Sequence, residues 1–223
     1  MSTGVASAIR AELDHKTKPP HSLGRIETLA VELGVAQRST SPTVDPARII
    51  VFAGDHGVAA DGVSAFPAEV TAQMCANFAS GGAAVAVLAR AYGAGLEVVD
   101  VGVAGDISHI DGIVHAKVAR GTDNLRSRAA IADDATLDQA LQVGRDAAAR
   151  AVAQGVRCVA LGEMGIGNTT SAAVVTALLC GGDADTVTGP GTGLDAAGLA
   201  AKRVVVAQAI ERCAPYISDP REC

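Results

Sequence analysis

Four short apolar runs, each ending at or near a glycine, constrain the fold of this 223-residue chain more than any other feature. They are ARIIVFAGDHG (47–57), LEVVDVGV (96–103), IVHAKVARG (113–121) and VRCVALGEMGIG (156–167). Each apolar run is too short for a helix and is rich in valine or isoleucine, which favours a strand buried on both faces. Such strands are typical of parallel sheets, because helices cover both faces of a parallel sheet.

Helical patterns separate these runs. The segment after Pro67 carries apolar residues at four-residue spacing, and alanine-rich helices are predicted over 81–91 and 136–153. This alternation predicts an α/β fold with a mainly parallel, Rossmann-like sheet flanked by helices. Ligands of such sheets bind beyond the carboxyl ends of the strands, where the GDHG and GEMGIGN sequences lie.

The N-terminal part has a different pattern. A helix over 2–15 precedes Pro19-Pro20, and a second helix is predicted from about Ser22. The apolar stripe of this second helix consists of Leu23, Ile26, Leu29, Ala30 and Leu33. We predict that residues 1–40 are a helical segment of a small domain, and that residues 41–223 are an α/β nucleotide-binding domain truncated at its C-terminus.

The C-terminal residues resemble the start of a helix. Ser218 or Asp219 is a candidate N-cap, Pro220 suits the first helical position, and Glu222 follows. The chain stops one residue later, at Cys223. This pattern indicates a piece of a longer polypeptide, and a frayed terminus is the alternative.

The composition excludes several classes of function. The chain has 18 Lys and Arg against 24 Asp and Glu, a net charge of −6, so it lacks the basic face of a nucleic-acid-binding protein. The apolar stretches are interrupted before they reach the length of a membrane span, and the N-terminus lacks the apolar core of a secretory leader. The five cysteines have no ligand spacing, which predicts buried thiols in a reducing cytoplasm and no metal site.

The GEMGIGNTT segment is the strongest candidate for a binding site. It follows a strand and opens a helix, where backbone N–H groups and the helix dipole favour an anion such as a phosphate. Gly165 and Gly167 permit close approach of a ligand, and Asn168 and Thr169 add short polar side chains. A tight turn capped by Asn168 or Thr169 is the alternative. Glu163 would repel a phosphate, so it suits a ribose hydroxyl or a cationic ring.

Two other loops carry weaker signals. The GPGTGLD segment precedes a helix in which Asp195 is the predicted N-cap and Lys202 could reach a phosphate, although by itself it resembles a loop with a surface lysine. Asp55 and His56 follow the first strand, and with Ser64 they could form a catalytic triad. Ser64 does not lie in a G-x-S-x-G elbow, so we do not expect a triad.

An apolar helix face follows Phe66-Pro67. Its residues Met74 and Phe78 could line a slot for a flat hydrophobic ligand, and ordinary core packing is the alternative.

Four segments together resemble one enzyme family. They are KPPHSLGRIETLAVELG (18–34), FAGDHGVAADGVSAFPAEVTAQM (52–74), GEMGIGNTTSAAVV (162–175) and GPGTGLDAAGLAAKR (189–203). Their order and spacing are similar to those of the nicotinate-nucleotide–dimethylbenzimidazole phosphoribosyltransferase family, from about residue 18 to the end. An unrelated α/β nucleotide-binding enzyme would require these long strings to be coincidental.

The resemblance implies an activity. The family transfers the phosphoribosyl group of nicotinate mononucleotide to 5,6-dimethylbenzimidazole, which yields nicotinate and α-ribazole 5′-phosphate with inversion at the anomeric carbon. It implies small-molecule substrates, no cofactor, no metal, no nucleic acid or membrane partner, and a cytoplasmic homodimer.

The resemblance also implies site residues. The positions that match the family's nucleotide and phosphate site are Glu163, Gly165, Ile166, Gly167, Asn168, Thr169 and Lys202. The positions that match the benzimidazole slot are Ser64, Phe66 and Met74.

The chain departs from the family in one respect. Members continue with a GGFE- or GGLE-like segment, whose glutamate is the general base, and a later DGF-like segment, and neither is present here. We therefore expect the general base beyond Cys223, with Glu163 in a supporting role, and little or no turnover by these residues alone. A catalytically silent protein that binds a nucleotide or a benzimidazole on the same scaffold is the alternative.

Overall fold

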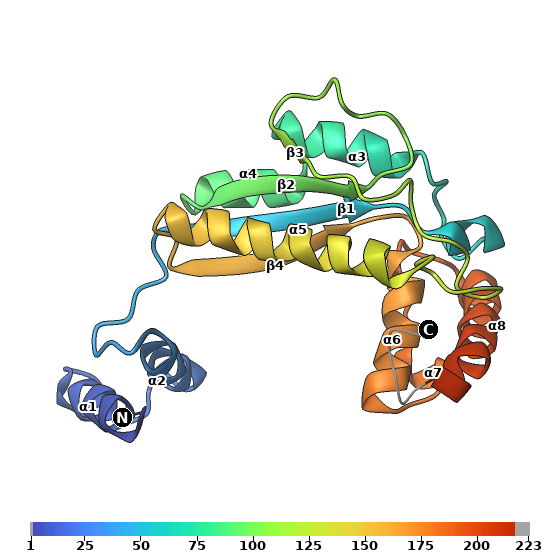
Figure 1. Ribbon diagram of the computed structural model, residues 1–223. Helices are drawn as coiled ribbons and strands as arrows, with labels where there is room; N and C mark the ends of the chain where they lie inside the picture. Colours follow the sequence, from blue (N-terminus) through green and yellow to red (C-terminus); the bar gives the residue numbers. More distant parts are fainter. Residues whose placement is uncertain (1, 217–223) are drawn as a thin grey trace. The chain divides into compact units, whose positions relative to one another are not determined.

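The structure is a computed structural model that describes residues 2–216 (Figure 1). The chain divides into two compact units, Met1–Pro46 and Ala47–Cys223. The helix start predicted at 218–222 lies outside the described residues.

The first unit contains two helices, α1 (Ser2–His15) and α2 (Arg25–Gln37). Gly34 allows their close approach, because a Cβ at this position would overlap the side chain of Ile9. Ile9 and Val31 are both buried, so this contact is the small apolar centre of the unit.

The second helix differs from its prediction in two ways. It begins at Arg25 rather than near Ser22, after a turn in which Gly24 has a φ of 55°. Leu23, Ile26 and Leu29 of the predicted stripe are 45%, 63% and 48% exposed, so this stripe does not face α1.

Four parallel strands form the sheet of the second unit, in the order β3-β2-β1-β4. They are β1 (Ala47–Gly54), β2 (Gly95–Gly102), β3 (Ile113–His115) and β4 (Cys158–Met164). The four apolar runs therefore form strands, and the predicted parallel α/β sheet is confirmed. The predicted burial is wrong for β4, an edge strand in which Val159 and Leu161 are 40% and 78% exposed. Because β1 pairs with β2 on one side and with β4 on the other, the chain reverses direction across the sheet at β1, which is where parallel sheets bind ligands.

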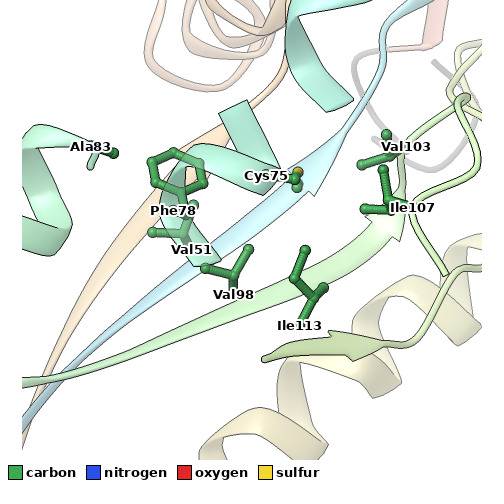
Figure 2. Packing of buried hydrophobic residues seen from close by; sticks show 9 residues of the cluster. Val51, Cys75, Phe78, Ala83, Val98, Val103, Ile107 and Ile113 are labelled. Atoms are coloured by element: carbon green, nitrogen blue, oxygen red, sulfur yellow. The ribbon is translucent and has the colours of Figure 1, made fainter. Parts of the chain in front are cut away.

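Helices cover both faces of this sheet. The helices α3 (Val70–Ala79) and α4 (Ala84–Ala91) lie on one face and α5 (Asp134–Ala153) lies on the other (Figure 1). Alternate residues of β1 enter different cores. Val51 packs with Cys75, Phe78 and neighbours on the α3 face (Figure 2), and Ile50 packs with Ala147 and neighbours on the α5 face.

The stretch Val70–Ala91 is long and apolar enough to cross a membrane, by length and composition alone. Here it consists of α3 and α4, separated by a turn at 80–83, and each helix packs its inner side against the sheet.

A helical part follows β4. It contains α6 (Asn168–Cys180), α7 (Ala184–Val187) and α8 (Ala196–Cys213). The predicted N-cap of α8 is confirmed, because the Asp195 carboxylate accepts a hydrogen bond from the Gly198 amide at 2.8 Å. Short 3-10 helices, η1 (Gly57–Asp61) and η2 (Ala214–Tyr216), complete the described elements.

An ion-pair cluster fixes the other end of the sheet. The Glu97 carboxylate lies 3.2 Å from the Arg48 guanidinium and 2.6 Å from that of Arg150, so it joins β1, β2 and α5. The Glu97 side chain is only 11% exposed, which strengthens both interactions.

Replacing Glu97 with glutamine should lower the free energy of unfolding by about 2 kcal/mol, because two guanidinium groups lose their shared anion. Urea unfolding followed by circular dichroism measures this change. The matched control is Asp185→Asn, which removes the exposed pair with Arg203 and should change stability by less than about 0.5 kcal/mol. Equal effects of the two substitutions would contradict the prediction.

Candidate active site

A cavity of about 570 Å³ lies at the carboxyl ends of the strands, against the first half of α5. Its apolar wall comes from both the sheet and the covering segments, and includes Phe52, Val101, Val118, Ile131 and Leu141. Its polar lining includes Asp55, His56, Arg120, Asp123, Glu163 and Asn168. Phe52 and Val101 also pack against the core on the α5 side, so the cavity opens on that face of the sheet.

A buried lysine, Lys202, is the second candidate binding group. The sequence by itself suggested a surface lysine, but the residue is only 1% exposed. The ammonium group donates a hydrogen bond to Thr169 Oγ1 at 2.7 Å, and no carboxylate of the described residues lies within ion-pair distance of it. Burial lowers the pKa of Lys202. A buried cation of this kind is stabilised by an anion that replaces its lost hydration.

The glycine-rich loop 189–193 passes over this pair. A Cβ at Gly191 would lie 2.9 Å from Lys202 Nζ and 2.9 Å from Thr169 Oγ1, and the residue has a φ of 56°. Only glycine fits this position without strain. We call Thr169 of α6, Gly191 of the loop and Lys202 of α8 the cradle.

The loop between β4 and α6 is held tightly. A Cβ at Gly165 would overlap the carbonyl oxygen of Gly54, and Gly167 has a φ of 93°. Ile166 is buried, and its amide donates to Thr71 Oγ1 at 3.1 Å, so that amide already has a partner in the protein. Gly167 is the N-cap of α6 and provides no side-chain cap.

The residues predicted to bind the nucleotide therefore fall into two adjoining groups. Glu163 and Asn168 line the cavity, and Thr169 and Lys202 form the cradle. Asn168 and Thr169 are consecutive residues of the first turn of α6, so the backbone of this turn links the two groups.

The residues predicted for the benzimidazole slot lie elsewhere. Ser64 Oγ is 2.9 Å from Thr192 Oγ1, which ties its loop to the loop over the cradle. Phe66 is 52% exposed, whereas Met74 packs against the core on the α3 face. None of the three lines the cavity.

His56 is bonded to a residue that the sequence did not indicate. Its Nδ1 lies 3.0 Å from Ser171 Oγ, on the first turn of α6, and not against Ser64. This arrangement agrees with the expectation that no Asp55-His56-Ser64 triad forms. Burial lowers the pKa of His56, and the nearby negative charge of Asp55 only partly opposes this shift.

His56 should titrate with a midpoint below about 6.5, the ordinary histidine value, in an NMR pH titration of its ring resonances. Because the unfolded chain takes up this proton first, stability should fall as the pH decreases below about 6.5. This part of the pH dependence should be missing in His56→Gln. A midpoint above the ordinary value would contradict the prediction.

The α5 wall of the cavity and Arg120 were not predicted from the sequence. The signal was present, since the third apolar run ends in Arg120-Gly121, a strand-end glycine like those after the first and fourth runs. Residues of α5 such as Leu141 were indistinguishable in sequence from core residues.

The cysteines and acidic groups of the described residues form no cluster that could hold a metal ion. Within residues 2–216, no three His, Cys, Asp or Glu side chains are grouped so that they could hold a metal ion. Burial, together with the charge of Asp100, raises the pKa of the Cys75 thiol to about 11. The prediction of buried thiols holds for Cys75 and Cys213, whereas Cys180 is exposed.

Comparison with known proteins shows the relationship. A family model described as "Phosphoribosyltransferase" matches residues 1–223. The chain is 48% identical over 209 residues to a nicotinate-nucleotide–dimethylbenzimidazole phosphoribosyltransferase of Aromatoleum aromaticum, covering 94% of this chain and 60% of the relative. It is 51% identical over 214 residues to the protein of the same name from Chromobacterium violaceum, covering 96% and 62%.

The fold is also similar to that of solved structures. A crystal structure of CobT from Thermus thermophilus superposes with a TM-score of 0.89 at 44% identity, and covers 94% of this chain and 62% of that one. The chain thus spans about three fifths of the length of the proteins it matches. Because it is similar to these proteins along nearly all of its own length, the chain belongs to the phosphoribosyltransferase family that the matching family model describes.

Proposed function

We propose that this chain serves phosphoribosyl transfer from nicotinate mononucleotide to 5,6-dimethylbenzimidazole, and that it supplies the nucleotide-binding part of the site. The observation that carries this proposal is the buried Lys202 of α8, which is covered by Gly191 and bonded to Thr169 on the first turn of α6. The relatives named for this reaction support the choice of substrates.

The cradle receives the 5′-phosphate. The ammonium group of Lys202 gains an anionic partner, and the N-terminus of α6 adds its partial positive charge. Gly191 leaves room for the phosphate oxygens, because any side chain there would meet Lys202 and Thr169.

The ribose lies next to the phosphate, beside Asn168 and Glu163. The bond between the anomeric carbon and the pyridinium nitrogen breaks, and its electron pair stays with this nitrogen, which becomes the neutral ring nitrogen of the released nicotinate anion. Positive charge then develops on the ribose, where the Glu163 carboxylate stabilises it.

The azole nitrogen attacks the anomeric carbon from the opposite face, and the ring loses its N–H proton to a carboxylate. The resemblance implies that this base is a glutamate in the additional length of the relatives, with Glu163 in support. Ser64, Phe66 and Met74 are the proposed residues for the benzimidazole, and the cytoplasmic homodimer belongs to the same proposal.

The test combines a binding and a turnover measurement on the 223-residue chain. Calorimetry with nicotinate mononucleotide should show binding, and chromatography after adding dimethylbenzimidazole should show little or no nicotinate release. Absence of nucleotide binding would overturn the proposal. Release at enzyme-like rates would keep the function but make Glu163 the leading candidate for the base.

A further inference from the structure

One hydroxyl group joins two loops of the second unit. Thr192 belongs to the loop 189–193 between α7 and α8, and its Oγ1 accepts a hydrogen bond from the Ala65 amide at 3.0 Å. The same oxygen lies 2.9 Å from Ser64 Oγ, which accepts a hydrogen bond from the Phe66 amide at 3.2 Å. Among the described residues, each hydrogen bond that leaves the segment 64–66 ends on Thr192.

Packing contributes little to the position of the segment 64–66. Ala65 and Phe66 are both exposed, Phe66 by 52%. Segments with few buried contacts have low local stability. The hydrogen bonds to Thr192 are therefore the main contacts that hold Ser64 and Phe66 in place.

The loop 189–193 is attached at its centre and loosely packed at its ends. A Cβ at Gly189 or at Gly193 would meet no atom within 4 Å, whereas one at Gly191 would lie 2.9 Å from Lys202 Nζ. Because Gly191 covers the ammonium group, an anion bonded to Lys202 contacts the loop at the residue before Thr192.

An anion in the cradle can therefore act on the segment 64–66 through a single residue. Contacts between the anion and Gly191 restrict a loop whose three glycines give it wide conformational freedom. Thr192 passes this restriction on to Ser64 and Ala65. A second ligand that binds the ordered segment then loses less conformational entropy, and each ligand increases the affinity for the other by the same factor.

We infer that Thr192 is a positioning residue, through which a phosphate in the cradle orders the segment 64–66 and increases the affinity for the benzimidazole. The inference rests on the proposed function, which places the phosphate in the cradle and the benzimidazole at Ser64 and Phe66. Direct contact between the two bound ligands is the alternative source of such cooperativity, and it does not depend on Thr192.

The Ala65 amide reports on this link in the unaltered 223-residue chain. Saturation with ribose 5-phosphate should slow the hydrogen exchange of this amide, measured by NMR, about fivefold, the lower end of the usual range for coupled sites. The Ser108 amide is the internal control, because it also donates to a side-chain oxygen in an exposed loop, that of Asp106 at 3.0 Å, and it should not respond. Equal slowing of both amides, or no change at Ala65, would overturn the inference.

A second experiment measures the effect on the other substrate. In calorimetry, dimethylbenzimidazole should bind about fivefold more tightly in the presence of saturating ribose 5-phosphate than in its absence. Thr192→Val keeps the shape of the side chain and removes the hydroxyl, so it should abolish both this increase and the slowing at Ala65. Thr192→Ser is the matched control, because it keeps the hydroxyl, and it should retain both effects.

The outcomes distinguish the inference from the proposed function. An increase in affinity that persists in Thr192→Val would identify direct contact between the ligands and overturn the inference, as would no increase in the unaltered chain. Both results leave the phosphate site intact, whereas failure of the unaltered chain to bind ribose 5-phosphate would overturn the inference and the proposed function together. If Thr192→Val does not fold, the comparison of the Ala65 and Ser108 amides decides by itself.

Discussion

Lys202→Met should reduce affinity for nicotinate mononucleotide about 100-fold, because the phosphate loses a buried cation and a charge-assisted hydrogen bond. Affinity for ribose 5-phosphate should fall by the same factor, since both ligands carry the phosphate. Calorimetry on the 223-residue chain measures both constants.

The same substitution should leave the midpoint of urea unfolding unchanged or raise it. The Lys202 side chain is buried with no carboxylate partner among the described residues, so the free protein bears the cost of removing the ammonium from water. Methionine has a similar length and no charge, and it removes this cost. This result would mean that the protein gives up stability at the proposed anion site.

Two measurements make this prediction specific. Arg145→Met removes one positive charge from the exposed side of α5 and should change neither phosphate affinity nor stability appreciably. In the unaltered chain, stability should rise with pH between the lowered pKa of Lys202 and about 10.5, because in this window the unfolded chain holds a proton that the folded chain has released. Lys202→Met should lack this rise. A clear loss of stability in Lys202→Met would contradict the account of the cradle.

Gly165→Ala should destabilise the protein by about 3 kcal/mol or more. The added Cβ would overlap the backbone carbonyl of Gly54, and neither β1 nor the loop after β4 can move without breaking strand pairing. Because this loop also packs against His56 and leads into the cradle, nucleotide binding should fall in the same variant. Thermal and urea unfolding measure the first effect, and calorimetry measures the second.

Gly144→Ala is the control for Gly165→Ala. Gly144 lies in the interior of α5, and a Cβ there would meet no atom within 4 Å. Alanine is the better helix former, so this variant should be about 0.5–1 kcal/mol more stable. If Gly165→Ala were tolerated as well as Gly144→Ala, the contact between β1 and the β4–α6 loop would not be as close as described.

The stretches with a strong local pattern were predictable. The valine- and isoleucine-rich runs favoured strands, and their alternation with helices permitted few arrangements other than a parallel sheet. Burial of each strand was not predictable, since β4 lies at the edge of the sheet and is largely exposed. The position of GEMGIGN at a strand end followed from that fold. The N-cap at Asp195 was also local, because a short side chain three residues before a free amide caps a helix in most contexts.

The site itself depended on contacts between distant residues. Lys202 resembles any helical lysine in sequence, and only the packing of α6 against α8 and the loop at Gly191 buries it against Thr169. The bond from His56 to Ser171 joins residues 115 positions apart. The exposure of Phe66 and the separation of Met74 from the cavity depend on which face of the sheet each segment covers.

The sequence alone therefore determined the elements, the sheet and the glycine-rich loops at the carboxyl ends of the strands, because hydrophobic period and turn chemistry act within about ten residues. Only the tertiary structure decided which side chains share the cavity and which cation is buried. Burial and long-range hydrogen bonds arise when separate elements pack together, and no short-range pattern encodes them.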